Sequence, residues 1–204
     1  MSSAAPDKLL ARAERKNRKR QEKKDQIASS ALQALQELGY ANTSLRDIAE
    51  KAGLSLGMLH YYFEDRTALI LHCVTAYKTT FISLLREAVG NADGREAIMD
   101  ALAKGLATTI VEDASTHRLW YDLRSQALFD PTFRPAVRDI EQALIEIVAM
   151  AATRAGKADE VDASLGYAVL DGVFRYQMQN QVTGTPRDQE SLAMEMRAVL
   201  ETFL

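Results

Sequence analysis

Cysteine is almost absent from this sequence, because Cys73 is the only one in 204 residues. A single cysteine excludes an intramolecular disulfide and a metal site built from several cysteines, which fits a reducing compartment. No stretch approaches the roughly 18 uninterrupted apolar residues that a membrane-spanning helix needs. The basic N-terminus is followed by no apolar run, so we expect no secretory signal. These absences predict a cytoplasmic protein with no membrane partner.

Strand patterns are missing as well. No stretch of five or more residues alternates convincingly between apolar and polar side chains, and we find neither internal repeats nor low-complexity segments. Apolar residues instead recur at helical spacing along most of the chain. The sequence predicts an all-α fold of about nine helices, of which the last five are expected at roughly 95–112, 116–128, 132–155, 159–181 and 187–203.

Charge is unevenly distributed, although the net charge is only −3. Residues 1–24 hold nine Lys or Arg and three Asp or Glu, whereas residues 67–204 hold 13 basic and 19 acidic residues. A basic end on an acidic body is typical of a segment that contacts a polyanion. Residues 1–24 are therefore expected to be either a solvated extension of the first helix or an arm that touches DNA. The acidic body is not expected to contact DNA.

The first two helices can be placed from their end signals. Gly39 follows a helical stripe and is expected to end the first helix, whose apolar face consists of Ile27, Ala31, Ala34, Leu35 and Leu38. Thr43 or Ser44 can cap a second helix, and Asp47 stands at the capping-box position three residues after Ser44. The apolar face of that helix is expected to be Leu45, Ile48, Ala49 and Ala52.

A third and a fourth helix follow closely. Gly53 is expected to end the second helix, Ser55 to cap a short third helix, and Asp65 to cap a long fourth one. The apolar stripe of the fourth helix is predicted to be Leu69, Cys73, Tyr77, Phe81, Leu84 and Leu85. Two short helices joined by a tight turn with glycine and packed on a longer helix form a helix-turn-helix unit. In such a unit the second short helix projects side chains into a DNA major groove about 12 Å wide.

The segment "GYANTSLRDIAEKAGLSLGMLHYYFEDRTAL" resembles the N-terminal signature of the TetR family of bacterial transcriptional regulators. The match extends from Ile27 to Leu71 without gaps, and it includes Gly39, Thr43, Ser44, Arg46, Asp47, Ile48, Ala49, Ala52, Gly53, Ser55, Gly57, Leu59, Tyr61 and Phe63. The resemblance implies a homodimer with a helix-turn-helix DNA-binding domain at 25–66, preceded by the basic arm at 1–24. It also implies a ligand-binding and dimerisation domain at 67–204.

The resemblance assigns roles to single residues of the head. Thr43 and Ser44 would hold a phosphate through hydroxyl and backbone N–H groups, and Arg46 would reach a phosphate or a base edge. The recognition helix would begin with Ser55, Leu56, Gly57 and Met58, where the family reads bases. The expected phosphate contacts continue with His60, Tyr61, Tyr62 and Arg66.

Two residues depart from the pattern of the family. His60 stands where tyrosine is commoner, and Leu56 stands where a polar or basic residue is usual. With Leu56 and Met58 at the start of the recognition helix, base readout is expected to use apolar contacts with thymine methyl groups. His60 has no cysteine or second histidine within helical reach, so no metal ligand set is expected. No catalytic motif surrounds Ser55, and neither a catalytic residue nor a cofactor is predicted.

The body offers weaker signals. The segment "HRLWYDLRSQALFDPTFRPAVRDI" at 117–140 resembles the BetI-type branch of the family. A pocket between helices needs apolar walls and a few polar groups, and plain core packing is the competing interpretation for each apolar candidate. Trp120 is the strongest candidate because its N–H prefers a partly polar environment, and Arg124 could select an anion. The full set of candidates is Tyr77, Phe81, Met99, Trp120, Arg124, Phe129, Phe174 and Met178.

The last two helices can form a homodimer. The final helix has an apolar stripe of Leu192, Met196, Val199, Leu200 and Phe203, and the preceding helix has a face of small and apolar residues, namely Leu165, Val169, Gly172 and Val173. Two such hairpins make a four-helix bundle across a two-fold axis. The stripe of the final helix could instead close the core of the monomer.

The leading hypothesis is a ligand-responsive repressor. A dimer would bind a palindromic operator in double-stranded DNA, and an unknown small-molecule effector in the body would lower its DNA affinity. The alternative is a DNA-binding regulator without a small effector, which is controlled by a protein partner or acts constitutively. An enzyme is the least favoured class because no titratable cluster is evident.

Overall fold

The structure is a computed structural model that describes residues 4–204, with side chains described for residue 12 and residues 14–204. The chain divides into two compact units, one up to Ala76 and one from Tyr77 to Leu204. We call them the head and the body. Every regular element in the described residues is helical, which confirms the predicted fold class.

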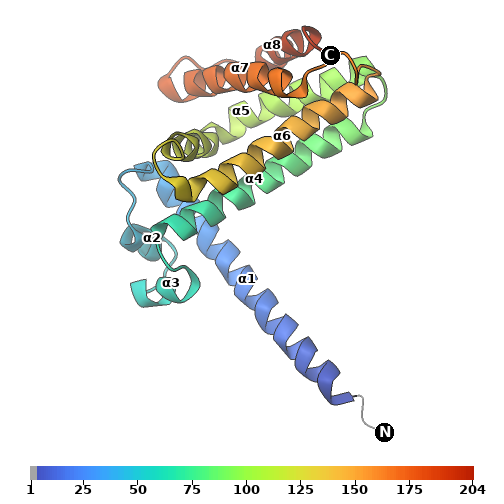
Figure 1. Ribbon diagram of the computed structural model, residues 1–204. Coiled ribbons are helices and arrows are strands. Elements are labelled where there is room, and N and C mark those ends of the chain that lie inside the picture. The colour runs from blue at the N-terminus through green and yellow to red at the C-terminus, as the bar shows by residue number, and fades with distance from the viewer. Residues whose placement is uncertain (1–3) are drawn as a thin grey trace. The chain divides into compact units, whose positions relative to one another are not determined.

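The head consists of α1 (Ala4–Leu38), α2 (Leu45–Lys51), α3 (Leu56–Tyr62) and the first part of α4 (Arg66–Asn91) (Figure 1). Helix α1 includes the described part of the basic arm, so this segment is a continuous extension of the first helix. The sequence left open whether residues 1–24 extend the first helix or form an arm that touches DNA. From Ala4 onwards their backbone is helical. Residues 1–3 lie outside the described part of the chain.

Local hydrogen bonds define the ends of the two short helices. The Ser44 hydroxyl accepts from the Asp47 backbone N–H, and the Asp47 carboxylate accepts from the Ser44 backbone N–H at 2.7 Å. This is the predicted capping box. The Ser55 hydroxyl accepts from the Met58 N–H at 3.2 Å and caps α3. Gly53 lies between them with a φ of 63°, a left-handed conformation that glycine adopts without steric cost.

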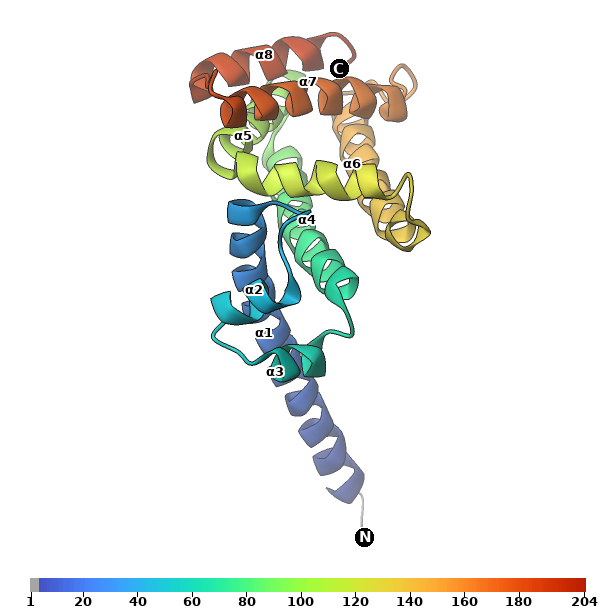
Figure 2. The same ribbon diagram turned by 90° about the vertical axis from the view of Figure 1, so that its left-hand side faces the viewer.

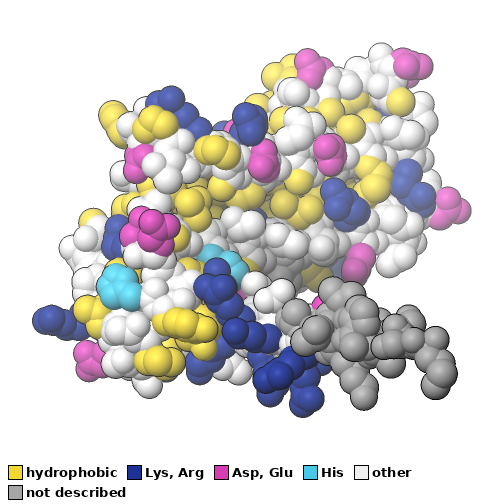
Figure 3. Space-filling model, turned by 60° about the horizontal axis from the view of Figure 1, so that its bottom comes forward, with side chains coloured by type: hydrophobic (Ala, Val, Ile, Leu, Met, Phe, Trp, Pro, Cys, Tyr) yellow, Lys and Arg dark blue, Asp and Glu magenta, His cyan; other side chains and the backbone are white. Residues whose placement is uncertain are grey.

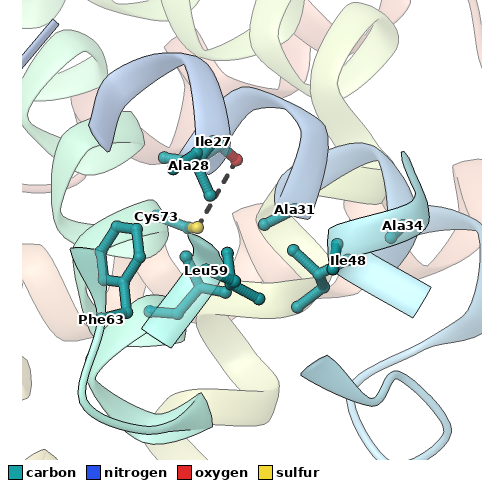
Figure 4. Packing of buried hydrophobic residues seen from close by; sticks show 10 residues of the cluster. Ile27, Ala28, Ala31, Ala34, Ile48, Leu59, Phe63 and Cys73 are labelled. Atoms are coloured by element: carbon teal, nitrogen blue, oxygen red, sulfur yellow. Dashed lines mark hydrogen bonds between the residues drawn. The ribbon is translucent and has the colours of Figure 1, made fainter. Parts of the chain in front are cut away.

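One buried cluster holds the head together (Figure 4). Side chains of α1, α2, α3 and α4 meet in it, and its buried members are Ile27, Ala28, Ala31, Ala34, Ile48, Ala49, Leu59, Phe63, Leu69 and Cys73. The alanines of α1 and α2 allow the two helices to approach closely. Each fully buried Ile or Leu contributes roughly 1.5–3 kcal/mol of transfer free energy. The Cys73 thiol donates to the Ala28 carbonyl, and burial raises the pKa of this thiol to about 12, so it is an unreactive core residue.

The body consists of the second part of α4 with α5 (Arg95–Gln126), the short 3-10 helix η1 (Pro131–Phe133), α6 (Arg134–Arg154), α7 (Ala163–Thr183) and α8 (Gln189–Glu201). Helices α7 and α8 lie side by side, and both pack against α5 (Figure 2). Gly166 of α7 lies so close to Phe203 and Val148 that an added Cβ would be 3.0–3.1 Å from their side chains.

Two details differ from the sequence-based prediction. The expected helices at 95–112 and 116–128 are one element, α5, with a kink at Asp113, whose φ and ψ of −120° and 15° are not helical. The described residues therefore form eight α-helices and one 3-10 helix where about nine helices were expected. Leu84 was predicted in the apolar stripe of α4 but is 59% exposed, because it lies one position before the buried Leu85 on the solvent side.

Helix α4 is the one element of the described chain with the length and apolar content to cross a membrane. In its most apolar window, 44% of the residues are buried inside the protein. Core helices of globular proteins have the same composition, and α4 supplies core side chains to the head and to the body.

Candidate nucleic-acid interface and body cavity

Helix α3 presents two different faces. Leu59 and the following Phe63 are buried at 1% and 3% exposure, and they anchor the helix to the core of the head. On the other side, Leu56, Gly57, Met58, His60 and Tyr61 are exposed, with Tyr61 at 60%. These five residues form what we call the reading face. They are residues that the sequence assigned to DNA contact, and α3 brings them together on one surface.

Tyr62 and Arg46 differ in how far they are exposed. Tyr62 is half-buried against the core cluster, and its ring meets the Tyr61 ring edge-to-face with centroids 5.0 Å apart. Arg46 is exposed on α2. Arg46 and the reading face are therefore accessible to a large partner, whereas the Tyr62 ring also supports the head.

The start of α2 differs from the expectation that both hydroxyl groups hold a phosphate. Thr43 is buried at 2% exposure, and its hydroxyl donates to the Gly39 carbonyl at 2.7 Å. It fixes the turn between α1 and α2, so the expected phosphate contact of this hydroxyl does not agree with the structure. The exposed Ser44 hydroxyl lies 2.6 Å from the Asp47 carboxylate, whose pKa is lowered by hydrogen bonds from Ser44. An intrinsic anion thus already occupies this helix end.

Arg66 also differs from its expected role. Its Nε donates to the Thr43 carbonyl at 2.7 Å, and its Nη2 donates to the Tyr40 carbonyl. Its guanidinium also lies 4.4 Å from the centroid of the Tyr40 ring. Arg66 therefore connects the start of α4 to the α1–α2 turn. With these donors in use, the side chain holds the head together, and a direct phosphate bond would require it to give up these contacts.

Two basic residues of α1 lie beside α3, and the sequence pattern does not single them out as candidates for DNA contact. The Arg20 guanidinium lies 5.7 Å from the centroid of the Tyr61 ring, and the Lys24 ammonium lies 5.1 Å from that of the Phe63 ring. Both line an open groove of about 540 Å³ that also includes His60. Figure 3 shows Lys and Arg side chains gathered next to a hydrophobic patch on the lower face of the molecule. The only signal in the sequence was the dense positive charge of residues 1–24, which does not specify a face.

The body contains a cavity of about 60 Å³ with mostly apolar walls. Its polar lining residues are Lys78, Tyr121, Tyr167 and Asp171, and its apolar lining residues are Phe81, Leu85, Leu102, Leu106, Leu144, Ile147, Val148, Leu170 and Phe174. Of the ligand-binding candidates from the sequence, Phe81 and Phe174 line this cavity. The mixture of apolar walls and a few polar groups is that of a ligand site, although the volume is well below the roughly 300–1,000 Å³ of ligand pockets.

The other candidates lie elsewhere. Met99, Trp120 and Met178 are core residues with at most 2% exposure, and the structure does not include them among the lining residues. The half-buried Tyr77 contacts His117 with ring centroids 5.0 Å apart, outside the lining. Phe129 is 84% exposed in the turn after α5, which disagrees with a place in a pocket wall. Arg124 pairs with Glu141 at 2.7 Å and with Asp171 at 2.5 Å, so its charge is already balanced by carboxylates.

Lys78 is a charged lining residue that was not among the candidates from the sequence. It is 2% exposed, and burial lowers the pKa of its ammonium from 10.5 to about 7. Its Nζ lies 3.3 Å from Nδ1 of His117, whose pKa burial and the Lys78 charge hold well below its usual value. The available signal was a single charged residue inside the apolar stretch of α4.

The last two helices bury one predicted dimer face and expose the other. Leu192, Met196 and Leu200 of α8 are fully buried in the body and belong to the core of the monomer, whereas Val199 and Phe203 of the same stripe are half-buried. On α7, Leu165 and Tyr176 are 63% and 61% exposed, and Val169 and Gly172 lie on the same helix face. We call Leu165, Val169, Gly172 and Tyr176 the α7 face.

Within the described residues, no group of three or more His, Cys, Asp or Glu side chains is arranged to hold a metal ion. The features that the described residues do present are an exposed helix face, a basic groove and a small cavity.

Comparisons with known proteins agree with this architecture. A sequence model of bacterial regulatory proteins of the tetR family matches residues 27–73, and a model of the tetracyclin repressor-like C-terminal domain matches residues 93–204. The second match alone spans more than half of the chain. The chain belongs to the TetR family. The resemblance in the head segment is thereby confirmed, and the TetR-type head and body account for most of the chain.

Relatives and solved structures extend the likeness over most of the chain. The HTH-type transcriptional regulator BetI of Burkholderia mallei is 23% identical over 175 residues, which cover 84% of this chain and 88% of BetI. A TetR transcription regulator from Haloarcula marismortui has a TM-score of 0.76 at 19% identity and covers 90% of this chain and 99% of its own. FadR of Bacillus subtilis, solved in complex with stearoyl-CoA, has a TM-score of 0.71 at 18% identity, covering 86% and 95%.

Membership of this family makes the protein a helix-turn-helix DNA-binding transcriptional regulator. The similarity to BetI agrees with the resemblance seen at 117–140. These relatives are regulators of transcription.

Proposed function

We propose that this TetR-family protein is a cytoplasmic repressor that binds a palindromic operator as a homodimer and is released by a small-molecule effector. Residues 25–66 form the DNA-binding domain, residues 1–24 form a basic arm, and residues 67–204 bind the effector and a second copy. Helix α4 supplies side chains to the head core and to the body cavity, so it is the element through which effector binding changes DNA affinity.

The reading face is the observation that carries this proposal. Five neighbouring residues of α3, three of them large and apolar or aromatic, are exposed on a helix whose other side is fixed in the core. A lone protein gains nothing from exposing Leu56, Met58 and Tyr61 together, whereas a DNA major groove offers thymine methyl groups and phosphates to such side chains. We assign base contacts to Leu56, Gly57 and Met58.

Phosphate contacts surround these base contacts. We assign them to Arg46, Ser55, His60 and Tyr61, and we add Arg20 and Lys24 from the groove beside α3. We assign an indirect role to Ser44, Tyr62 and Arg66. Their polar groups or rings already contact the head, so they hold α2, α3 and α4 in position for the DNA contacts of other residues. Affinity supplied mainly by phosphates falls steeply as salt rises.

The homodimer is assigned to the α7 face. A helix-turn-helix protein that reads a palindrome needs two heads related by a two-fold axis. The exposed Leu165, Val169 and Tyr176 with Gly172 between them offer a flat apolar strip on which a second copy of the same helix can pack. Helix α8 supports α7 from the core side and contributes only its exposed Met194.

The experiment is selection of DNA from a random duplex pool by the purified full-length protein. The proposal predicts enrichment of an inverted repeat whose half-site centres are about one helical turn, or a small multiple of it, apart. When the selected site is placed between a promoter and a reporter, expression of the protein should lower reporter output. A pool that stays random, or a reporter that is activated, would contradict the proposal.

A further inference from the structure

Lys78 is a buried cation without a carboxylate partner. Among the described residues its hydrogen-bond partner is Nδ1 of His117 at 3.3 Å, and no Asp or Glu oxygen lies within ion-pair distance of its Nζ. Its Nζ lies 4.8 Å from the centroid of Phe81 and 4.9 Å from that of Trp120. Aromatic faces attract a cation but do not satisfy its N–H donors, so a protonated Lys78 retains hydrogen-bonding capacity.

A second donor on the cavity wall has no partner. The Tyr167 hydroxyl has no hydrogen-bond partner within the described part of the chain, although Tyr167 is only 9% exposed. Lys78 of α4 and Tyr167 of α7 both line the cavity. A buried polar group without a partner is costly, and its presence in a native structure requires an explanation.

The carboxylate on the cavity wall, that of Asp171, already has hydrogen-bond partners. Asp171 accepts from the Tyr121 hydroxyl at 3.0 Å and pairs with Arg124 at 2.5 Å. Arg124 in turn also binds Glu141. An incoming group therefore meets a carboxylate that is already occupied, a Tyr167 hydroxyl without a partner and a Lys78 ammonium with N–H groups beyond the one that faces His117. This asymmetry favours a ligand that supplies acceptor atoms and negative charge.

We propose that the effector is a small monocarboxylate with a short apolar tail, whose head group binds the Lys78 ammonium and the Tyr167 hydroxyl. This inference rests on the proposed function, since it names the chemical class of the effector. The leucine, valine and phenylalanine side chains of the wall enclose the tail. A carboxylate supplies about four acceptor positions, so it can bind both donors at once.

The size of the cavity limits the tail. Its volume is about 60 Å³, whereas a cavity of about 150 Å³ binds benzene. This space is smaller than a six-carbon ligand needs, so a straight chain of about four to six carbons enters only when the leucine side chains of the wall move apart. Butanoate and hexanoate are the probes of choice.

Binding should also take up a proton. Burial lowers the pKa of Lys78 to about 7, although the Asp171 charge opposes this shift, and the nearby charge of Arg124 lowers the pKa further. A bound carboxylate favours the ammonium form and returns the pKa toward its ordinary value. Near pH 8 the empty site holds mostly neutral lysine, so hexanoate binding takes up nearly one proton.

The experiment compares thermal stabilisation of the full-length protein by hexanoate, by its neutral isostere hexanamide and by hexylammonium. Hexanoate should raise the melting temperature of the wild type and of Lys104→Met, which removes an exposed lysine of α5 and serves as the matched control. The shift should be much smaller in Lys78→Met, because the affinity falls at least about ten-fold without the charged donor. Calorimetry near pH 8 in two buffers of different ionisation enthalpy should show proton uptake by the wild type and by Lys104→Met, but not by Lys78→Met.

A second variant keeps the test decisive if Lys78→Met fails to fold. Tyr167→Phe removes one hydroxyl that has no partner, so it should keep the melting temperature of the free protein and weaken hexanoate binding several-fold. Equal stabilisation by hexanamide or hexylammonium, an unchanged hexanoate affinity in both variants, or no stabilisation by either carboxylate would overturn the inference.

The two proposals can fail separately. Binding of the selected DNA site is measured without any carboxylate, so a protein that binds its operator but no carboxylate refutes only the effector class. A protein that binds hexanoate through Lys78 but keeps its operator affinity refutes release by this ligand and leaves the carboxylate site intact.

Discussion

The charges of Arg20 and Lys24 can be removed together to test whether the groove beside α3 contacts DNA. Both residues lie next to the rings of α3, and neither forms an ion pair with a carboxylate in the described part of the chain. If each neutralises one phosphate, a dimer loses four contacts in the variant Arg20→Gln/Lys24→Gln. Each phosphate contact contributes about −0.9 to the slope of log K against log salt, so the slope should become shallower by about 3.6.

The assay is fluorescence anisotropy with the selected duplex at several salt concentrations. Between about 50 and 200 mM salt, a slope difference of about 3.6 means that wild-type affinity falls roughly 150-fold more than that of the variant. The matched control is Lys104→Gln/Arg138→Gln, which removes one lysine and one arginine from exposed sites of the body and should keep the wild-type slope. An unchanged slope in the Arg20/Lys24 variant would refute the assignment of these residues to phosphates.

Four further outcomes follow from the structure. Tyr61→Ala should lower operator affinity about ten-fold but change the free energy of unfolding by less than about 1 kcal/mol, since the ring is 60% exposed; a large loss of stability in urea unfolding would make Tyr61 a core residue. Thr43→Val should cost roughly 1–2 kcal/mol of stability because the Gly39 carbonyl loses its donor, and an unchanged unfolding midpoint would restore the phosphate role of the hydroxyl. Val169→Asp should convert the dimer to a monomer in analytical ultracentrifugation, and a persistent dimer would place the interface elsewhere. The pKa of Lys78 is lowered to about 7 by burial, so the unfolded chain binds more protons above pH 7 and the free energy of unfolding should rise with pH from about 7 to 9; Lys78→Met should flatten this rise, and an equal rise in both proteins would argue against the lowered pKa.

The parts of the fold that depend on local chemistry could be predicted from the sequence. The capping box of Ser44 and Asp47, the cap of α3 at Ser55 and the turn at Gly53 all involve residues within a few positions of one another. The same locality explains why Leu59 and Phe63 could be assigned to the core and Tyr61 to the surface, because helical spacing alone separates the two faces.

Contacts between residues far apart in the chain could not be predicted from the sequence. The carbonyls that the Arg66 guanidinium binds belong to Tyr40 and Thr43, and only the folded head brings them together. Arg20 and Lys24 were not singled out because their nearness to α3 also depends on the tertiary structure. A family pattern gives the usual role of a position, and the neighbours in the structure decide whether its donors are free.

The body was harder to interpret than the head. Apolar residues such as Met99 and Trp120 fit a core and a pocket wall equally well, and only the packing of the helices separates the two. Lys78 carried the better signal, since a charged residue in an apolar helix is unusual and costly.

The most direct measurement of the central claim is equilibrium binding to two duplexes: the selected inverted repeat, and the same duplex with one half-site scrambled. Two reading faces held by one dimer should bind the intact repeat with a stoichiometry of two chains per duplex. Loss of one half-site should weaken binding at least about 100-fold, because the second head then makes only nonspecific contacts. Equal affinity for the two duplexes would contradict the account.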